Sequence, residues 1–228
     1  MNSLTEEIPE LEALKGLDQG SHHYLDAWKH TLEVFEGLKK MLNDPEAILS
    51  NLPLPKRPDI LLLAALLHDI GKPACKVITE KGTQFIGHED KGAEMAADIG
   101  ARLGMSPDAV LYLKSLVSLH MRPLSLISNW PVSDTVMARM LRDSAPYTSD
   151  MLLLSMADIM ASRKPGSESA DLDNLNALIT IISQPKIDKP PEIAPLLTGE
   201  DIKARNIKPG PGYKVMLSEA SASDSITL

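Results

Sequence analysis

A run of eight apolar residues that ends in a histidine and an aspartate constrains this chain more than any other feature. Residues 60–67 read ILLLAALL, without glycine or proline, which predicts a helix buried on most of its faces. His68 and Asp69 follow directly, and Gly71 and Pro73 are expected to end the helix. An unpartnered buried polar group costs roughly 2–7 kcal/mol, and a charge costs more. The pair therefore needs a partner, which is either a metal ion or, as for most isolated His-Asp pairs, a neighbouring hydrogen-bonding group.

The composition favours a helical protein. Aromatic residues make up 4% of the 228 residues, whereas leucine, alanine and methionine are abundant. A formal net charge of -8 argues against sequence-independent binding of nucleic-acid phosphates over the whole surface, although it allows a local basic groove. No DNA partner is expected. The single cysteine, Cys75, cannot form an internal disulfide, and no segment has the pattern of a signal peptide or a membrane span. We expect a cytoplasmic protein with no membrane partner.

Helical spacing of apolar residues predicts several more helices. One runs from Tyr24 to Leu42 and places His30 at the margin of its apolar stripe, with Asp26 in reach to orient the imidazole. The residues before it are expected to be disordered or weakly helical. Further helices are expected over residues 88–104, 109–120, 135–143, 151–164 and 171–183.

The segments between these helices carry turn and cap signals. Ser106, Ser133 and Ser149 are expected to cap the helices that follow them. A short hairpin or an irregular loop is expected within residues 75–87, and a second loop within residues 121–130; these two should set specificity.

The composition changes after residue 184, where prolines, glycines and lysines become frequent and residues 185–217 carry a net charge of +2. We expect a helical core over residues 1–184 and a small C-terminal appendage, with a disordered end, over residues 185–228.

Four histidines and two aspartates fall at predicted helix ends or on apolar helices. They are His30, His68, Asp69, His88, His120 and Asp158. Imidazoles and carboxylates on separate segments suit one or two divalent cations, either of the first transition row or Mg²⁺, better than a thiolate zinc site. Composition and periodicity do not show that the six converge, and a histidine considered alone is more often a satisfied core or surface residue.

The segments around these residues resemble one family. HTLEV at His30, LLHDIGKP at His68, FIGHEDKGAEMA at His88, LVSLHMRP at His120 and LLLSMADIMA at Asp158 match in order the pattern of the HD superfamily of metal-dependent phosphohydrolases. More narrowly, the chain resembles the HD domain that follows the nucleotidyltransferase head of bacterial CCA-adding enzymes and poly(A) polymerase relatives.

The similarity extends over roughly residues 22–217 and includes the tail segment LLTGEDIKARNIKPGPGYKVML. This segment resembles a motif found beyond the HD domain in the same group. It departs from that motif at Ile202, where leucine is usual, and at Tyr213-Lys214, where a second glycine is expected.

The resemblance implies an all-α HD-domain helical bundle that binds divalent metal, with Mn, Mg, Ni, Fe and Co as candidates. It assigns Asp69 to one metal or to a bridge between two. It assigns His30, His68 and Asp158 to the first site, and His88 and His120 to a second. Lys72 and Arg122 are placed to contact substrate phosphate, although a solvated loop lysine and a surface ion pair fit the sequence equally well.

The expected function is hydrolysis of phosphomonoesters or phosphodiesters, with nucleotides or RNA ends, including 2′,3′-cyclic phosphates, as substrates. The alternative is a binding module for a tRNA-like RNA or a partner protein such as a nucleotidyltransferase, with a structural or vestigial metal. A regulatory metal-binding partner of a signalling protein has no sequence feature in its favour. Only about twenty residues precede the HD-like region, so no nucleotidyltransferase head is expected here and the chain should not add nucleotides.

Overall fold

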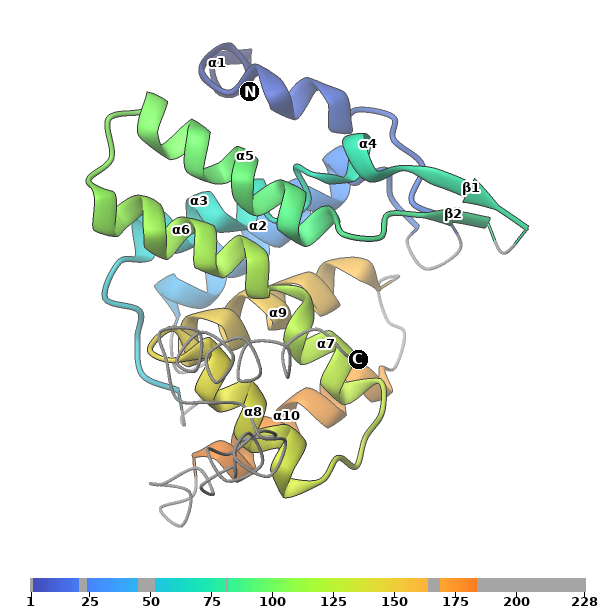
Figure 1. The fold of residues 1–228 in the computed structure, drawn as a ribbon, viewed down its shortest axis with the longest axis vertical. Coiled ribbons are helices and arrows are strands. Elements are labelled where there is room, and N and C mark those ends of the chain that lie inside the picture. The colour runs from blue at the N-terminus through green and yellow to red at the C-terminus, as the bar shows by residue number, and fades with distance from the viewer. Residues whose placement is uncertain (1, 21–23, 45–51, 81, 164–168, 184–228) are drawn as a thin grey trace, which may run out of the picture. The chain divides into compact units, whose positions relative to one another are not determined.

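The computed structural model describes residues 2–20, 24–44, 52–80, 82–163 and 169–183, which form helices and one short hairpin (Figure 1). The elements are α1 (Asn2–Glu7), the 3-10 helix η1 (Pro9–Leu14), α2 (Ala27–Asn43), α3 (Pro58–Leu67), α4 (Lys72–Cys75), β1 (Val77–Thr79), β2 (Gly82–Gln84), α5 (His88–Arg102), α6 (Pro107–Leu119), α7 (Met121–Ile127), α8 (Asp134–Ser144), α9 (Thr148–Ser162) and α10 (Ala170–Ile182). The expected all-α fold is confirmed. The predicted appendage from residue 185 onward lies outside the described residues.

Helix α9 passes through the core of the described residues. Every residue from Met151 to Ile159 is buried, and the helix packs against α2, α3, α6, α7, α8 and α10. A helix that is apolar on all sides is one enclosed by other elements. Asp158 is therefore held in the interior by the same helix that forms the centre of the core. Within the described ranges, no helix is long and apolar enough to span a membrane.

Helix α3 is the buried helix predicted from the apolar run. It ends at Leu67, earlier than Gly71 and Pro73 suggested, because residues 68–71 form a tight turn. Pro73 lies in the first turn of α4, where its missing N–H removes no helical hydrogen bond. The turn leaves His68 and Asp69 each 1% exposed.

The N-terminal part of the chain differs from the expectation in part. Of the two alternatives for the lead segment, the helical one holds, because it forms α1 and η1, and Leu11 and Leu14 of η1 are fully buried in the core. Helix α2 begins at Ala27 rather than Tyr24, because the Asp26 carboxylate caps it by accepting the Lys29 backbone N–H at 2.8 Å.

Later elements follow the prediction with three corrections. Residues 121–127 form helix α7 and not a loop, since Pro123 lies in its first turn. Ser106 is the N-cap residue of α6, as expected, but its side chain makes no cap hydrogen bond, and Ser149 lies inside α9, whose N-cap is Tyr147. The Ser133 cap is confirmed, because its Oγ accepts the Val136 N–H at 3.4 Å.

The hairpin expected within residues 75–87 is present as an antiparallel pair, β1 and β2, in which Ile78 lies opposite Thr83. Helices α5 and α6 run side by side after it (Figure 1).

Candidate metal centre

The six predicted metal-site residues meet in the interior of the helical core. His30 comes from α2, His68 and Asp69 from the turn after α3, His88 from the start of α5, His120 from the end of α6 and Asp158 from α9. None of these residues is more than 6% exposed. The structure thus brings together side chains that lie up to 128 positions apart in the sequence.

A first group surrounds one oxygen of Asp69. The His68 Nε2 lies 3.1 Å from Asp69 Oδ2, and the His30 Nε2 lies 3.7 Å from the same oxygen. The two Nε2 atoms are 3.4 Å apart. Asp158 joins the group through its Oδ1, which is 3.0 Å from His30 Nε2.

A second group surrounds the other oxygen of the same carboxylate. The Nε2 atoms of His88 and His120 lie 3.4 and 3.9 Å from Asp69 Oδ1. These two nitrogens are 3.2 Å from each other. Asp69 therefore stands between two clusters, His30-His68-Asp69 and Asp69-His88-His120, each of which could hold a metal ion.

Three of the histidines are oriented by the same local hydrogen bond. In each, Nδ1 lies close to the carbonyl oxygen three residues earlier: 2.8 Å for His68 and Ala65, 2.9 Å for His88 and Phe85, and 2.7 Å for His120 and Val117. A carbonyl can only accept, so Nδ1 carries the proton that it donates. The neutral form of each ring then presents an Nε2 lone pair toward Asp69, as a metal-binding histidine does.

The charges in the centre shift its pKa values. Burial raises the pKa of Asp69, but the neighbouring His68 and Lys72 outweigh burial and hold it well below the usual range. Burial also acts on Asp158, whose pKa is nevertheless lowered by the hydrogen bond from His30. Both groups are therefore carboxylates at neutral pH.

The two imidazoles with shifted pKa values respond in opposite directions. Burial lowers the pKa of His120 to about 3, helped by the charge that His68 can carry, so His120 is neutral at pH 7. Burial also disfavours protonation of His68, but the adjacent Asp69 carboxylate reverses this effect and raises its pKa.

The separations between these atoms fit metal coordination. Two ligand atoms that each lie about 2.1 Å from one ion, at an angle between about 90° and 109°, are about 3.0–3.4 Å apart. The Nε2 pairs at 3.2 and 3.4 Å fall in this range. Neutral lone pairs that face each other at such distances repel, and a shared cation converts that repulsion into attraction. Imidazole nitrogens with carboxylate oxygens form a donor set suited to divalent ions of the first transition row.

Lys72 is a buried neighbour of the centre and not a solvated loop residue. Its side chain is 8% exposed, and its Nζ donates to Asp69 Oδ2 at 2.7 Å. The ammonium also lies 5.6 Å from the centre of the Phe85 ring. Arg122, at the start of α7, lies two residues after His120 in the chain and is partly exposed.

Gln19 is a contributor that sequence reasoning missed. It is 5% exposed, its Oε1 accepts from Lys72 Nζ at 2.5 Å, and its Nε2 donates to the Leu25 carbonyl at 3.3 Å. It precedes α2 in a stretch without periodicity, so no pattern marks it. Asp26, expected to orient His30, has another role, because its carboxylate caps α2 and lies 3.2 Å from Lys29 Nζ.

Comparison with known proteins places this centre in a family. A family model described as "HD domain" matches residues 27–161, which is more than half of the chain and includes all six residues. The chain belongs to the HD domain family. The resemblance inferred from the sequence is thereby confirmed.

The HD domain chain is similar to two larger curated proteins along most of its own length. It is 31% identical over 211 residues to the A-adding tRNA nucleotidyltransferase of Deinococcus radiodurans, covering 90% of this chain and 44% of that protein. It is 33% identical over 199 residues to the CC-adding tRNA nucleotidyltransferase of Thermus thermophilus, covering 86% and 40%. The chain thus spans less than half the length of these relatives.

A shorter similarity links the HD domain chain to another kind of protein. Over 65 residues it is 45% identical to the bifunctional uridylyltransferase/uridylyl-removing enzyme of Mycobacterium tuberculosis, covering 28% of this chain and 7% of that protein.

Proposed function

We propose that this HD domain chain is a metal-dependent phosphohydrolase acting on phosphomonoesters or phosphodiesters, with nucleotides or RNA ends, including 2′,3′-cyclic phosphates, as substrates. The observation that carries the proposal is the position of Asp69, whose two oxygens each face a pair of histidine Nε2 atoms. In the proposed site Asp69 would help to hold one divalent ion or two. His30, His68 and Asp158 would complete the first position, and His88 with His120 would hold the second.

When bound, the metal supplies positive charge for the phosphoryl oxygens and lowers the pKa of a coordinated water. The protein's own residues do the rest. The Nδ1 hydrogen bonds hold the imidazoles of His68, His88 and His120 in one tautomer and orientation. Burial of the six ligands limits competition from bulk water and strengthens electrostatic interactions.

Two cationic residues are proposed to bind the substrate phosphate. Lys72 has its ammonium 2.7 Å from Asp69 Oδ2, so a phosphate that approaches the metal position comes within its reach. Arg122 lies two residues after His120 and is proposed to contact the same phosphate from α7.

A direct test combines elemental analysis of the purified chain with hydrolysis of bis-p-nitrophenyl phosphate and 2′,3′-cyclic AMP, with Mn²⁺, Ni²⁺ or Mg²⁺ added. We expect turnover that a chelator removes and that Asp69→Asn abolishes. Because loss of the Asp69 charge leaves the buried Lys72 without its ion pair, Asp158→Asn is a second test that keeps this pair intact. Asp98→Ala, on the exposed face of α5, is the matched control. Full activity in Asp69→Asn or Asp158→Asn would refute the proposal.

A second candidate function is a module that binds a tRNA-like RNA or a nucleotidyltransferase partner and uses the metal structurally. The similarity to two tRNA nucleotidyltransferases over most of this chain favours it. Metal content without turnover, together with tRNA binding by Asp69→Asn that weakens steeply as salt rises, would support this function over the first.

A further inference from the structure

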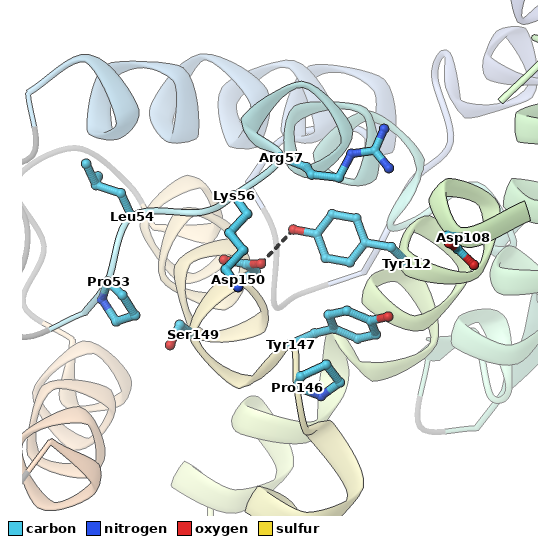
Figure 2. A pocket seen from close by; sticks show the side chains of 10 residues that line it. All are labelled: Pro53, Leu54, Lys56, Arg57, Asp108, Tyr112, Pro146, Tyr147, Ser149 and Asp150. Atoms are coloured by element: carbon cyan, nitrogen blue, oxygen red, sulfur yellow. Dashed lines mark hydrogen bonds between the residues drawn. The ribbon is translucent and has the colours of Figure 1, made fainter. Parts of the chain in front are cut away.

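A cavity lies away from the metal centre, near the N-terminal ends of α3, α6 and α9 (Figure 2). Its volume is about 380 Å³, within the range of small-molecule sites, and none of its lining residues belongs to the six of the metal centre. Tyr112 precedes His120 on α6, and Asp150 precedes Asp158 on α9, by about two helical turns, or about 12 Å in each case. The same helices therefore carry the metal centre at one level and this cavity at another.

Two tyrosines form one wall of the cavity. The ring centres of Tyr112 and Tyr147 lie 4.9 Å apart, with their planes tilted by 54°. Tyr112 is buried, whereas Tyr147 is partly exposed and presents its ring at the cavity. In Figure 2, Pro53 and Leu54 lie on the other side, and Leu54 is 64% exposed. The walls thus offer aromatic and apolar surface to a flat ring.

A carboxylate lies between these walls. The Tyr112 hydroxyl donates to Asp150 Oδ2 at 2.7 Å, which fixes the carboxylate in place (Figure 2). Among the described residues, no hydrogen-bond donor reaches the other oxygen, Oδ1, although the side chain is partly buried. A carboxylate of this kind accepts a hydrogen bond from an amino group, as it does from the exocyclic amine of a base.

Two cations are among the lining residues. Lys56 and Arg57 are consecutive, exposed, and form no ion pair with any described residue. An arginine beside a lysine suits a phosphate group. The carboxylate of Asp108 also lines the cavity, so a single phosphate is better accommodated than a long polyanion.

We infer that this cavity binds a nucleoside 5′-monophosphate whose base carries an exocyclic amino group. The base stacks on Tyr147 and lies against Leu54, its amino group donates to Asp150 Oδ1, and its phosphate contacts Lys56 and Arg57. The site is separate from the metal centre, so the inference does not depend on the proposed hydrolytic function.

The test is isothermal titration calorimetry on the full chain after removal of metal with EDTA, using AMP, CMP, UMP and adenosine as probes. We expect AMP and CMP to bind with one nucleotide per chain. UMP, which lacks the amino group, and adenosine, which lacks the phosphate, should bind at least about fivefold more weakly. No turnover or metal is required for this readout, so failure here and failure of the proposed hydrolase are distinguishable.

Variants locate the binding. Tyr147→Leu should weaken AMP binding at least about fivefold, whereas Tyr147→Phe, which keeps the stacking ring, should bind as the wild type does. Asp98→Ala, on the exposed face of α5, should leave AMP binding unchanged. Absence of AMP binding at millimolar concentration, or AMP binding that Tyr147→Leu does not weaken, would overturn the assignment. Equal binding of UMP and AMP would overturn the role of Asp150.

Discussion

Replacement of Gly71 by alanine should separate the two halves of the metal centre. A Cβ at Gly71 would lie 2.2 Å from the His88 carbonyl oxygen and 2.6 Å from the Gly92 backbone nitrogen, whereas ordinary contact begins at 3.4 Å. Both neighbours are backbone atoms of α5, so they cannot rotate away. The turn after α3 and the first turn of α5 must therefore move apart by about 1 Å, the difference between 2.2 and 3.4 Å.

This displacement has two measurable results. Overpacking of this kind costs about 1–3 kcal/mol, which lowers Tm by roughly 3–10 °C in a domain of this size. His88 moves with α5, so its Nε2 leaves its place 3.4 Å from Asp69 Oδ1, which the proposed second metal position needs. We expect the wild-type chain to take up two Mn²⁺ ions and the Gly71→Ala variant one, as measured by calorimetry and elemental analysis.

Gly37→Ala is the matched control. Gly37 lies within α2, and a Cβ there meets nothing within 4 Å. Alanine should raise the free energy of unfolding by about 0.5–1 kcal/mol and leave metal uptake unchanged. A Gly71→Ala chain with wild-type Tm and two bound ions would refute the argument, because it would mean that the contact between the turn and α5 does not position His88.

Two further perturbations test individual contacts. Gln19→Leu removes the acceptor that holds Lys72 and should lower the free energy of unfolding in urea by about 1.5–3 kcal/mol, while raising KM more than it lowers kcat. Gln84→Leu, on β2, should do neither, and equal effects of the two variants would contradict the role of Gln19. The metal-free chain should lose stability as pH falls from about 6.5 toward 3, because unfolded His120 takes up a proton that the folded form, with a pKa of about 3, refuses. The raised pKa of His68 affects stability only above about pH 6.5, where its stabilising contribution is lost as pH rises. The urea midpoints measured at pH 7 and pH 5 should therefore differ less in His120→Asn than in the wild type.

The sequence identified residues of the candidate metal centre where a polar residue interrupted a strong apolar pattern. His68, His120 and Asp158 stand out because they end or interrupt buried helices. Gln19 could not be found in this way, because it lies in a segment without periodicity and its partner, Lys72, is 53 residues away. Pattern reasoning identifies side chains that need a partner and leaves open which one the fold supplies.

The boundaries that were predicted wrongly have local causes. Asp26 was expected to orient the His30 imidazole because the two residues are four positions apart. Its carboxylate instead accepts a backbone N–H of the first turn of α2, a group that has no partner within the helix. A loop was expected within residues 121–130, but a proline in the first turn is compatible with a helix, and α7 forms there. In both cases the backbone N–H groups at the start of a helix decide the outcome, and the apolar pattern of the sequence carries no information about them.

The hydrogen bond from Nδ1 to the carbonyl three residues earlier gives the centre a particular tolerance to insertion and deletion. The rings of His68, His88 and His120 are each oriented by the backbone three residues earlier. The fold therefore has only to place three short backbone segments, each ending in one of these histidines, around Asp69. One residue inserted within α3 would rotate the backbone segment that ends in His68 by about 100° about the helix axis and move it by about 1.5 Å along that axis. One residue added at the tip of the β1–β2 hairpin would leave all three of these backbone segments in place. Length variation should therefore be tolerated in the hairpin and excluded from α3.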